Sequence, residues 1–261
     1  MSRINDIFSD AKSQGRKLLM PFFVGGHPVG ASTGALLDAI ERGGGAIAEI
    51  GIPFSDPIAD GPVIASAMHA ALTAGVTPEQ VFGEIAEARS ELSIGVVAMC
   101  SVSIASRMGG PAAFAKRAAE SGIDGLILPD APLEEAAEFT QAASEAGLTA
   151  TLLVSPSTPP DRAAAIAEAC SGFVYLLARA GVTGESDAAP DIAGSVAPLK
   201  NATPLPIAVG FGIGSAEQVR TVVKHADAAI VGSALVRRLS TADDPVAEAE
   251  SFTTSLAVGL A

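Results

Sequence analysis

The sequence predicts an α/β fold, a (β/α)8 (TIM) barrel in which a parallel sheet closes on itself inside a ring of helices. Eight short apolar runs alternate with Ala-rich amphipathic segments from end to end, a pattern typical of βαβ units. Eight such units in about 250 residues match the size of this barrel. Ala, Val, Ile and Leu supply most of the hydrophobic content, because the chain has no Trp and one Tyr, and this suits a buried parallel sheet. No linker or shift in composition divides residues 1–261, so we expect a single domain.

The expected strands are the apolar runs themselves. They lie at 18–24, 46–51, 94–98, 125–128, 149–154, 173–178, 207–209 and 228–231. The expected helices are the segments whose apolar residues recur every three or four positions. They lie near 31–42, 63–74, 77–90, 110–121, 134–146, 160–169, 190–199, 215–225 and 245–257. Ile4, Ile7, Phe8 and Ala11 show the same spacing ahead of the first strand and predict an extra N-terminal helix docked on the body.

The main alternative to a barrel is a doubly wound open sheet. Such a sheet usually carries G-x-G-x-x-G after its first strand, and the Gly-Gly-His-Pro at 25–28 does not fit that pattern. A barrel enzyme places its chemistry at the C-terminal ends of the strands. This rule selects residues that end or follow the expected strands: Phe22, Glu49, Asp60, Cys100, Asp130, Tyr175, 181–184, 210–212 and 232–233.

Two acidic residues stand out in the segment 48–62. Glu49 lies inside an apolar run, where a carboxylate is costly to bury unless it has a partner or a task. Asp60 lies in the loop that follows, whose geometry is set by glycines and prolines. Two carboxylates at one mouth of a barrel could perform acid/base catalysis. The structural alternative is a Glu at a strand end and an Asp in a local turn.

The loops after the last two expected strands predict a phosphate site. These loops often hold phosphate in this fold, and here they contain Gly212, Gly232 and Ser233. Glycines let backbone N–H groups approach an anion, and Ser233 adds a hydroxyl at the start of a helix. Gly184, in the preceding loop, could add another N–H group.

The composition excludes several classes of partner. A net charge of −13 disfavours nucleic acid and anionic membranes, which bind basic faces. No apolar run is long enough to span a membrane, and the N-terminus does not have the pattern of a signal peptide. The two cysteines, Cys100 and Cys170, have no metal-ligand spacing and are expected to be free thiols in a reducing compartment. We therefore expect a cytoplasmic protein.

The positions of the basic residues narrow the chemistry further. None of the five lysines ends an expected strand, which disfavours a Schiff-base aldolase. His27, His69 and His225 are scattered and form no recognisable metal set, so no metal is expected. Carbon–carbon chemistry in this chain would have to use carboxylates, with the substrate itself accepting electrons.

Six segments of the chain resemble the tryptophan synthase α subunit family. They are 49–62, 122–130, 172–175 with 181–184, 210–213 and 231–234, within a match that runs from about residue 3 to 258. The resemblance implies a lyase of L-tryptophan biosynthesis that cleaves indole-3-glycerol phosphate by retro-aldol chemistry to indole and glyceraldehyde 3-phosphate. It also implies an α2β2 tetramer in which a β subunit carries PLP and receives the indole, with no cofactor in this chain.

The resemblance also implies roles for individual residues. Glu49 would move the protons, and Asp60 would hold the indole N–H group. Phe22, Ile64 and Leu128 would line the indole pocket, Tyr175 would support Glu49 and the substrate, and Thr183 would lie in a mobile loop over Asp60. The phosphate would be bound by Gly184, Phe211, Gly212, Gly232 and Ser233. The residues expected to face the β subunit are Asp56, Pro129, Asp130 and Pro132.

The segment 99–103 departs from the family pattern. It reads Met-Cys-Ser-Val-Ser, where the family commonly has Met-Thr-Tyr followed by Asn-Pro, so an aromatic wall of the indole pocket is lost or supplied elsewhere. Three other functions stay open: a stand-alone lyase that releases indole, a non-catalytic barrel that activates a β subunit, and an unrelated sugar-phosphate isomerase. Kinetics without a partner would separate the first from a subunit. Retention of Glu49 and Asp60 argues against the second, and the absence of a base pair on other strands argues against the third.

Overall fold

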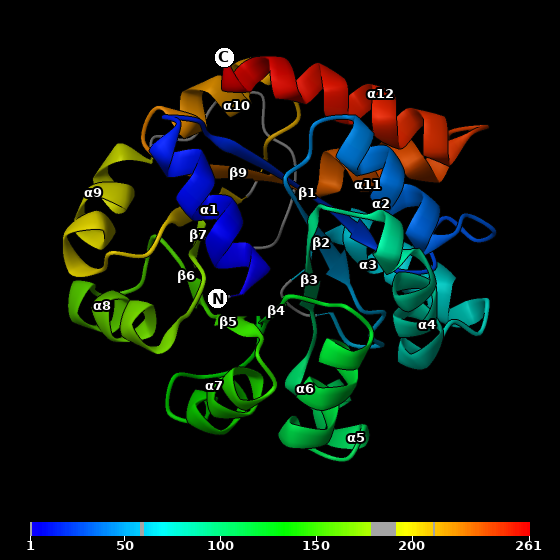
Figure 1. Ribbon diagram of the computed structural model, residues 1–261, viewed down its shortest axis with the longest axis horizontal. Helices are drawn as coiled ribbons and strands as arrows, with labels where there is room; N and C mark the ends of the chain where they lie inside the picture. Colours follow the sequence, from blue (N-terminus) through cyan, green and yellow to red (C-terminus); the bar gives the residue numbers. More distant parts are fainter. Residues whose placement is uncertain (1, 58–59, 179–191, 211) are drawn as a thin grey trace.

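The computed structural model describes residues 2–57, 60–178, 192–210 and 212–261, and in them one parallel sheet is surrounded by helices (Figure 1). The strands lie in the order β5-β4-β3-β2-β1-β9-β8-β7-β6. Their bounds are β1 Leu18–Val24, β2 Ile47–Gly51, β3 Gly95–Met99, β4 Gly125–Ile127, β5 Thr149–Thr151, β6 Leu153–Val154, β7 Val174–Leu177, β8 Ile207–Gly210 and β9 Ala228–Val231. This order confirms the predicted barrel.

The two ends of the sheet order, β5 and β6, are pieces of the single strand predicted at 149–154. β5 pairs with β4 and β6 pairs with β7, so the sheet returns to the same extended segment and closes. The break falls at Leu152, whose backbone N–H donates to Sγ of Cys170 at 3.2 Å. The N–H of Leu152 thus bonds to a thiol and not to a carbonyl of a neighbouring strand. The single strand predicted at 149–154 is interrupted there, so the sheet has nine strands where eight were predicted.

The helices confirm most of the predicted ranges. They are α2 Thr33–Arg42, α3 Pro62–Thr73, α4 Pro78–Ala88, α6 Pro111–Glu120, α7 Ala136–Glu145, α8 Pro160–Ala169, α9 Ala193–Ala202, α10 Ala216–Val223 and α12 Pro245–Ala257. Two further helices, α5 Val102–Arg107 and α11 Ser233–Thr241, lie outside the ranges expected from spacing, although Ser233 was expected to begin a helix. In the described residues, no helix has the length and apolar character needed to cross a membrane.

The start of helix α5 is capped by a local residue and by a distant one. Ser101 accepts a hydrogen bond from the backbone N–H of Ser103, at the start of the helix. Asp130 accepts from the N–H of Val102 at 3.0 Å and from Oγ of Ser101 at 2.6 Å. Capping by a carboxylate satisfies N–H groups that a helix leaves free at its start. Asp130 follows a different strand, so no local sequence pattern could reveal this cap.

Two apolar layers hold the barrel together. Alternate residues of β1 point to opposite faces, with Leu18 and Met20 in the cluster inside the barrel and Leu19 and Phe23 in the cluster between sheet and helices. All seven residues of β1 are buried. This explains why the strands read as continuous apolar runs and not as alternating patterns.

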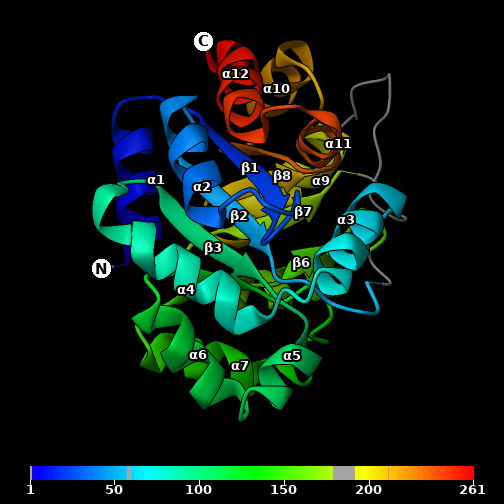
Figure 2. The ribbon, with the colours of Figure 1, turned by 90° about the vertical axis from the view of Figure 1, so that its right-hand side faces the viewer.

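The predicted N-terminal helix, α1 (Arg3–Ser13), covers the mouth at the N-terminal ends of the strands. Ile4, Phe8 and Ala11 are buried and belong to the cluster inside the barrel. The rings of Phe8 and Phe173 pack with their centroids 5.8 Å apart. Figure 2 shows α1 and α3 at opposite ends of the strands. The candidate active site lies at the opposite mouth, where the C-terminal ends of the strands meet.

Candidate active site

Glu49 and Asp60 meet in one pocket at the C-terminal ends of the strands. Glu49 is the third residue of β2, and Asp60 lies in the loop just before α3. β1, β2, β3, β7 and β9 contribute residues to the pocket from the middle of the strand to its C-terminal end, as expected for this fold. The pocket is lined by Phe22, Glu49, Asp60, Ile64, Met99, Tyr175, Leu177, Gly212, Ile230, Gly232 and Ser233.

The alternation of β2 directs Glu49 inward. Ala48 and Ile50 belong to the cluster between sheet and helices, whereas Ile47 belongs to the cluster inside the barrel, so Glu49 shares the inner face with Ile47. The side chain is fully buried, and neither carboxyl oxygen has a hydrogen-bond partner within the described part of the chain. A buried carboxyl with both oxygens unpaired is costly to stability, and this favours a functional role.

Burial raises the pKa values of both acids, and that of Glu49 more than that of Asp60. It raises the pKa of Glu49 to about 8, and the nearby carboxyl of Asp60 adds to the shift. Burial also raises the pKa of Asp60, to about 6. The Tyr175 hydroxyl is buried beside both acids, and its pKa lies well above the usual value. At pH 7 this order leaves Glu49 protonated and Asp60 ionised.

The structure brings most of the predicted substrate and phosphate residues to this pocket. Phe22, Ile64 and Tyr175 line it, and so do Gly212, Gly232 and Ser233. Gly212 has a φ of 73°, a conformation that favours glycine. Three other predicted residues, Thr183, Gly184 and Phe211, lie outside the described residues.

Leu128 is not brought to the pocket, contrary to the prediction that it lines the indole site. It follows Ile127, which points into the barrel. Since successive side chains of a strand alternate, Leu128 points the other way and packs in the cluster between sheet and helices. It is 1% exposed and supports the wall from behind.

Three apolar residues of the pocket, Met99, Leu177 and Ile230, were not predicted. Met99 ends β3 two residues after Val97, which lies inside the barrel, and Leu177 ends β7 two residues after Tyr175. Every second residue of a strand faces the same side, so the residues two positions after known inward-facing ones could have been predicted to line the pocket. Such a prediction needs the strand register, which the apolar runs alone do not supply.

At the segment that departs from the family pattern, Cys100 does not reach the pocket. It is 1% exposed and points into the cluster between sheet and helices, where burial raises the pKa of its thiol far above the usual value. The residue of this segment that lines the pocket is Met99, which the segment shares with the family pattern. Its flexible thioether side chain can fill irregular gaps.

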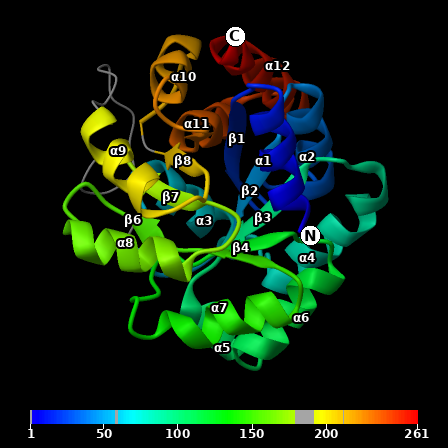
Figure 3. The ribbon, with the colours of Figure 1, turned by 60° about the vertical axis from the view of Figure 1, so that its left-hand side comes forward.

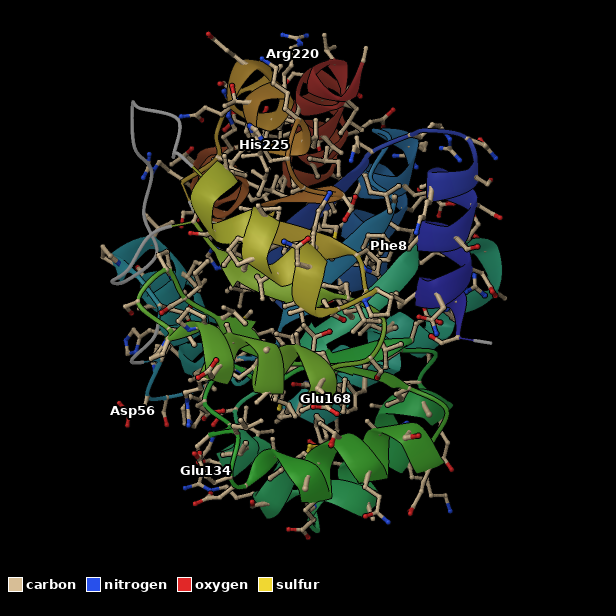
Figure 4. The ribbon with its side chains drawn as sticks, turned by 90° about the vertical axis from the view of Figure 1, so that its left-hand side faces the viewer. Phe8, Asp56, Glu134, Glu168, Arg220 and His225 are labelled. Carbon is tan, nitrogen blue, oxygen red and sulfur yellow. The ribbon has the colours of Figure 1, made fainter. Side chains whose placement is uncertain are left out.

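A second pocket adjoins the first, because Asp60 and Met99 line both. Asp56, Pro129 and Asp130, three of the residues predicted to face a partner, also line this second pocket, and Pro132 is exposed nearby in sequence. Figure 4 shows Asp56 at the end of the barrel opposite α1. The structure thus brings these residues next to the acid pair.

Within the described residues, no group of three His, Cys, Asp or Glu side chains could hold a metal ion.

Comparison with known proteins identifies close similarity over the whole chain. The family model described as tryptophan synthase alpha chain matches residues 8–258. A tryptophan synthase alpha chain from Synechococcus sp. (strain CC9902) is 43% identical over 253 residues, which are 95% of this chain and 94% of the relative. The corresponding protein of Burkholderia pseudomallei (strain K96243) is 39% identical and covers 100% of this chain and 97% of its own. A structure of Mycobacterium tuberculosis tryptophan synthase superposes with a TM-score of 0.90 at 36% identity, covering 99% of this chain and 98% of that chain.

Proposed function

The chain belongs to the tryptophan synthase alpha chain family, whose members are lyase subunits that cleave indole-3-glycerol phosphate, and we propose that Glu49 and Asp60 perform this cleavage here. The observation that carries the proposal is a fully buried, unpaired carboxyl beside a second carboxyl in a pocket at the C-terminal mouth of the barrel. Both acids have raised pKa values, and perturbed pKa values concentrate at functional sites.

Cleavage requires three changes in the substrate. A proton must reach C3 of the indole ring, the hydroxyl on the adjoining glycerol carbon must lose its proton, and the bond between these two carbons must break. Protonation at C3 produces an indolenine, which accepts the bonding electrons. The glycerol carbon then becomes the aldehyde of glyceraldehyde 3-phosphate, and indole is released.

We assign both proton transfers to Glu49. Because its pKa is about 8, the residue is protonated at neutral pH and can donate to C3. The resulting carboxylate can accept the proton of the hydroxyl, which restores the starting state. A pKa near the working pH suits a group that must both donate and accept. The unpaired oxygens of Glu49 leave it free to contact the substrate.

We assign stabilisation of the ring to Asp60. Its pKa of about 6 keeps it ionised at neutral pH, so it can accept a hydrogen bond from the indole N–H group. As C3 is protonated, positive charge develops on the ring. A fixed carboxylate at that position stabilises the charge most strongly in the transition state. Phe22, Ile64 and Met99 would contact the flat faces and edges of the ring.

We propose that the phosphate lies at Gly212, Gly232 and Ser233. Ser233 begins α11, and the N-terminus of a helix presents free N–H groups and a partial positive charge to an anion. Gly184 and Phe211 complete the proposed set. These residues line the same pocket as Glu49 and Asp60, so the substrate could contact both groups at once.

Replacement of Gly212 by Val should raise the KM for indole-3-glycerol phosphate by about tenfold or more, since a hydrogen bond to a charged group contributes about 1.5–3 kcal/mol. The side chain would obstruct the approach of the phosphate, and the backbone φ of 73° would be strained. Gly147, in a turn with a φ of 79° and open space around it, offers a matched control for the strain alone. Affinity for glycerol phosphate is the direct measurement. Normal affinity in a folded Gly212 variant would place the phosphate elsewhere.

The family implies a complex with a β subunit, and we propose the α2β2 tetramer as its form. Asp56, Pro129, Asp130 and Pro132 would face that subunit, which would carry PLP and receive the indole through the neighbouring pocket. We propose that this chain itself uses no cofactor and works in the cytoplasm.

The proposed function is tested by measuring release of indole from indole-3-glycerol phosphate with and without a β subunit. We expect release by the isolated chain and faster release in the complex. A rate that a β subunit leaves unchanged would indicate a stand-alone lyase. Absence of release under both conditions would refute the catalytic assignment and favour a non-catalytic activator.

A further inference from the structure

A further cavity, larger than the pocket of Glu49, lies at the mouth of the barrel that α1 covers. Its volume is about 360 Å³, within the range of about 300–1,000 Å³ that is typical of sites for small molecules. It lies between the end of α1, the start of β1 and the segment that joins α9 to β8. Figure 3 shows α1 and α9 on the same side of the molecule, and Figure 4 shows Phe8 between them. The lining residues are Phe8, Ala11, Lys12, Gly15, Arg16, Lys17, Lys200, Thr203, Pro204, Leu205, Pro206 and Asp227.

The charge of this cavity is opposite to that of the whole protein. The chain has 16 basic and 29 acidic residues and a net charge of −13. Lys12, Arg16, Lys17 and Lys200 all line the cavity, whereas Asp227 is the one acid among its described lining residues. A concave basic site raises the local concentration of anions even on a protein whose net charge is negative.

Asp227 organises two of the four cations without neutralising the site. The Nζ atoms of Lys17 and Lys200 lie 3.3 and 3.4 Å from the same oxygen, Oδ1. The other oxygen accepts a hydrogen bond from the backbone N–H of Ile207 at 3.0 Å. Burial would raise the pKa of Asp227, but the Ile207 N–H, Lys200 and Lys17 together lower it, so the group is ionised. One negative charge thus holds two ammonium groups side by side.

The other two cations are Lys12, in the last turn of α1, and Arg16, just after that helix ends. Arg16 donates from Nε to the side chain of Gln14 at 2.8 Å, a neutral partner that leaves its charge uncompensated. Lys12 has no ion pair with any residue in the part of the chain that the structure describes. Both side chains are exposed and can reach a ligand in the cavity.

The remainder of the lining is apolar. Phe8 is 6% exposed and is held by the ring of Phe173, and Pro204, Leu205 and Pro206 form the facing segment. Thr203 already accepts a hydrogen bond from the N–H of Leu205, which gives this segment a defined shape. A ligand that fits therefore combines a multiply charged anionic group with an apolar part.

We propose that this cavity binds a small phosphate monoester through Lys12, Arg16, Lys17 and Lys200, at a site separate from the acid pair. The phosphate dianion would lie among the four cations, and an apolar or ring-shaped part of the ligand would lie on Phe8 and Pro204. No residue of this site lines the pocket of Glu49.

The proposal is tested by titrating the full chain with phenyl phosphate and with inorganic phosphate, using calorimetry and amide chemical shifts. The Gly212→Val variant serves as the background, because it weakens the proposed phosphate site at the other mouth. We expect phenyl phosphate to bind this variant, to shift the amide signals of Gly15 and Leu205, and to bind more tightly than inorganic phosphate. Absence of these shifts, or shifts confined to the pocket of Glu49, would overturn the proposal.

Substitutions that should change the affinity in opposite directions are compared in the Gly212→Val background. Lys12→Gln with Arg16→Gln should weaken binding by about tenfold, since two exposed cations are lost. Lys116→Gln with Arg107→Gln removes the same charge from exposed positions elsewhere and should leave the affinity unchanged. Asp227→Asn should tighten binding, because it removes the one negative charge among the described lining residues while the amide oxygen can still accept from Ile207. Equal effects of the two paired variants would show that only net charge matters and would refute a built site.

Discussion

Replacing Glu49 with Gln should reduce the rate of indole-3-glycerol phosphate cleavage by roughly 10²–10⁴-fold, the usual loss when an acid/base group is removed. Gln has nearly the same shape as protonated Glu but cannot give up or accept a proton at the carboxyl. The pocket should therefore keep its form, and affinity for glycerol phosphate should change little. Single-turnover release of indole is the measurement. A rate within a few-fold of the parent in the Glu49→Gln variant would exclude Glu49 from the proton transfers.

The pH dependence of stability gives an independent check on Glu49. Its folded-state pKa of about 8 lies above the ordinary value of 4.5. Its contribution to the free energy of unfolding is therefore fully present below pH 4.5 and is lost as the pH rises through 8. The Glu49→Gln variant has no such group, so its advantage in stability over the parent should grow between these pH values. Denaturant titrations at pH 5 and pH 8.5 would reveal it, and parallel curves for the two proteins would argue against a buried, neutral Glu49.

Replacing Asp60 with Asn should reduce the cleavage rate by roughly 10²–10³-fold, the loss seen when one charge-stabilising group is removed from a transition state. The Asn oxygen can still accept a hydrogen bond from the indole N–H group, but it carries no charge to stabilise the developing cation. Asp60→Ala loses the hydrogen bond as well and should be as slow or slower. Near-normal single-turnover rates in both variants would remove Asp60 from the chemistry.

The pH profile of the rate distinguishes the roles of the two acids. Activity should rise as Asp60 ionises near pH 6 and fall as Glu49 loses its proton near pH 8. Asp60→Asn should abolish the lower limb. It should also move the upper limb to lower pH, because the carboxyl of Asp60 contributes to the raised pKa of Glu49. An unchanged profile in this variant would mean that the limbs belong to other groups.

Some of the candidate site could be read directly from residue types. Glu49 is an acid inside an apolar strand, and the cost of burying a carboxylate marks it without knowledge of the fold. Gly212 and Gly232 mark close approach of the backbone, and the structure brings both to the pocket of Glu49. These residues could be predicted because their types conflict with, or are specially suited to, their local surroundings.

Other residues could not be assigned from their types. Leu128 and Met99 are both apolar and both end or follow a strand, yet Leu128 faces the helices and Met99 faces the pocket. The difference is one residue of register, which reverses the direction of a side chain. Every strand here is buried on both faces, so the apolar runs carry no alternation from which the register could be read.

From the sequence alone, the barrel and nearly all of its strands and helices could be predicted, and the acid pair and the glycine loops could be proposed, because each depends on local periodicity or on a residue type at odds with its neighbours. Only the tertiary structure decided which strand residues face the pocket, that Asp130 caps α5, that Lys17 and Lys200 pair with Asp227, and that Lys12 and Arg16 line the same cavity. These features join residues that are far apart in the chain. They exist only because closure of the sheet brings the ends of separate strands and helices together, and no pattern within a single segment encodes that meeting.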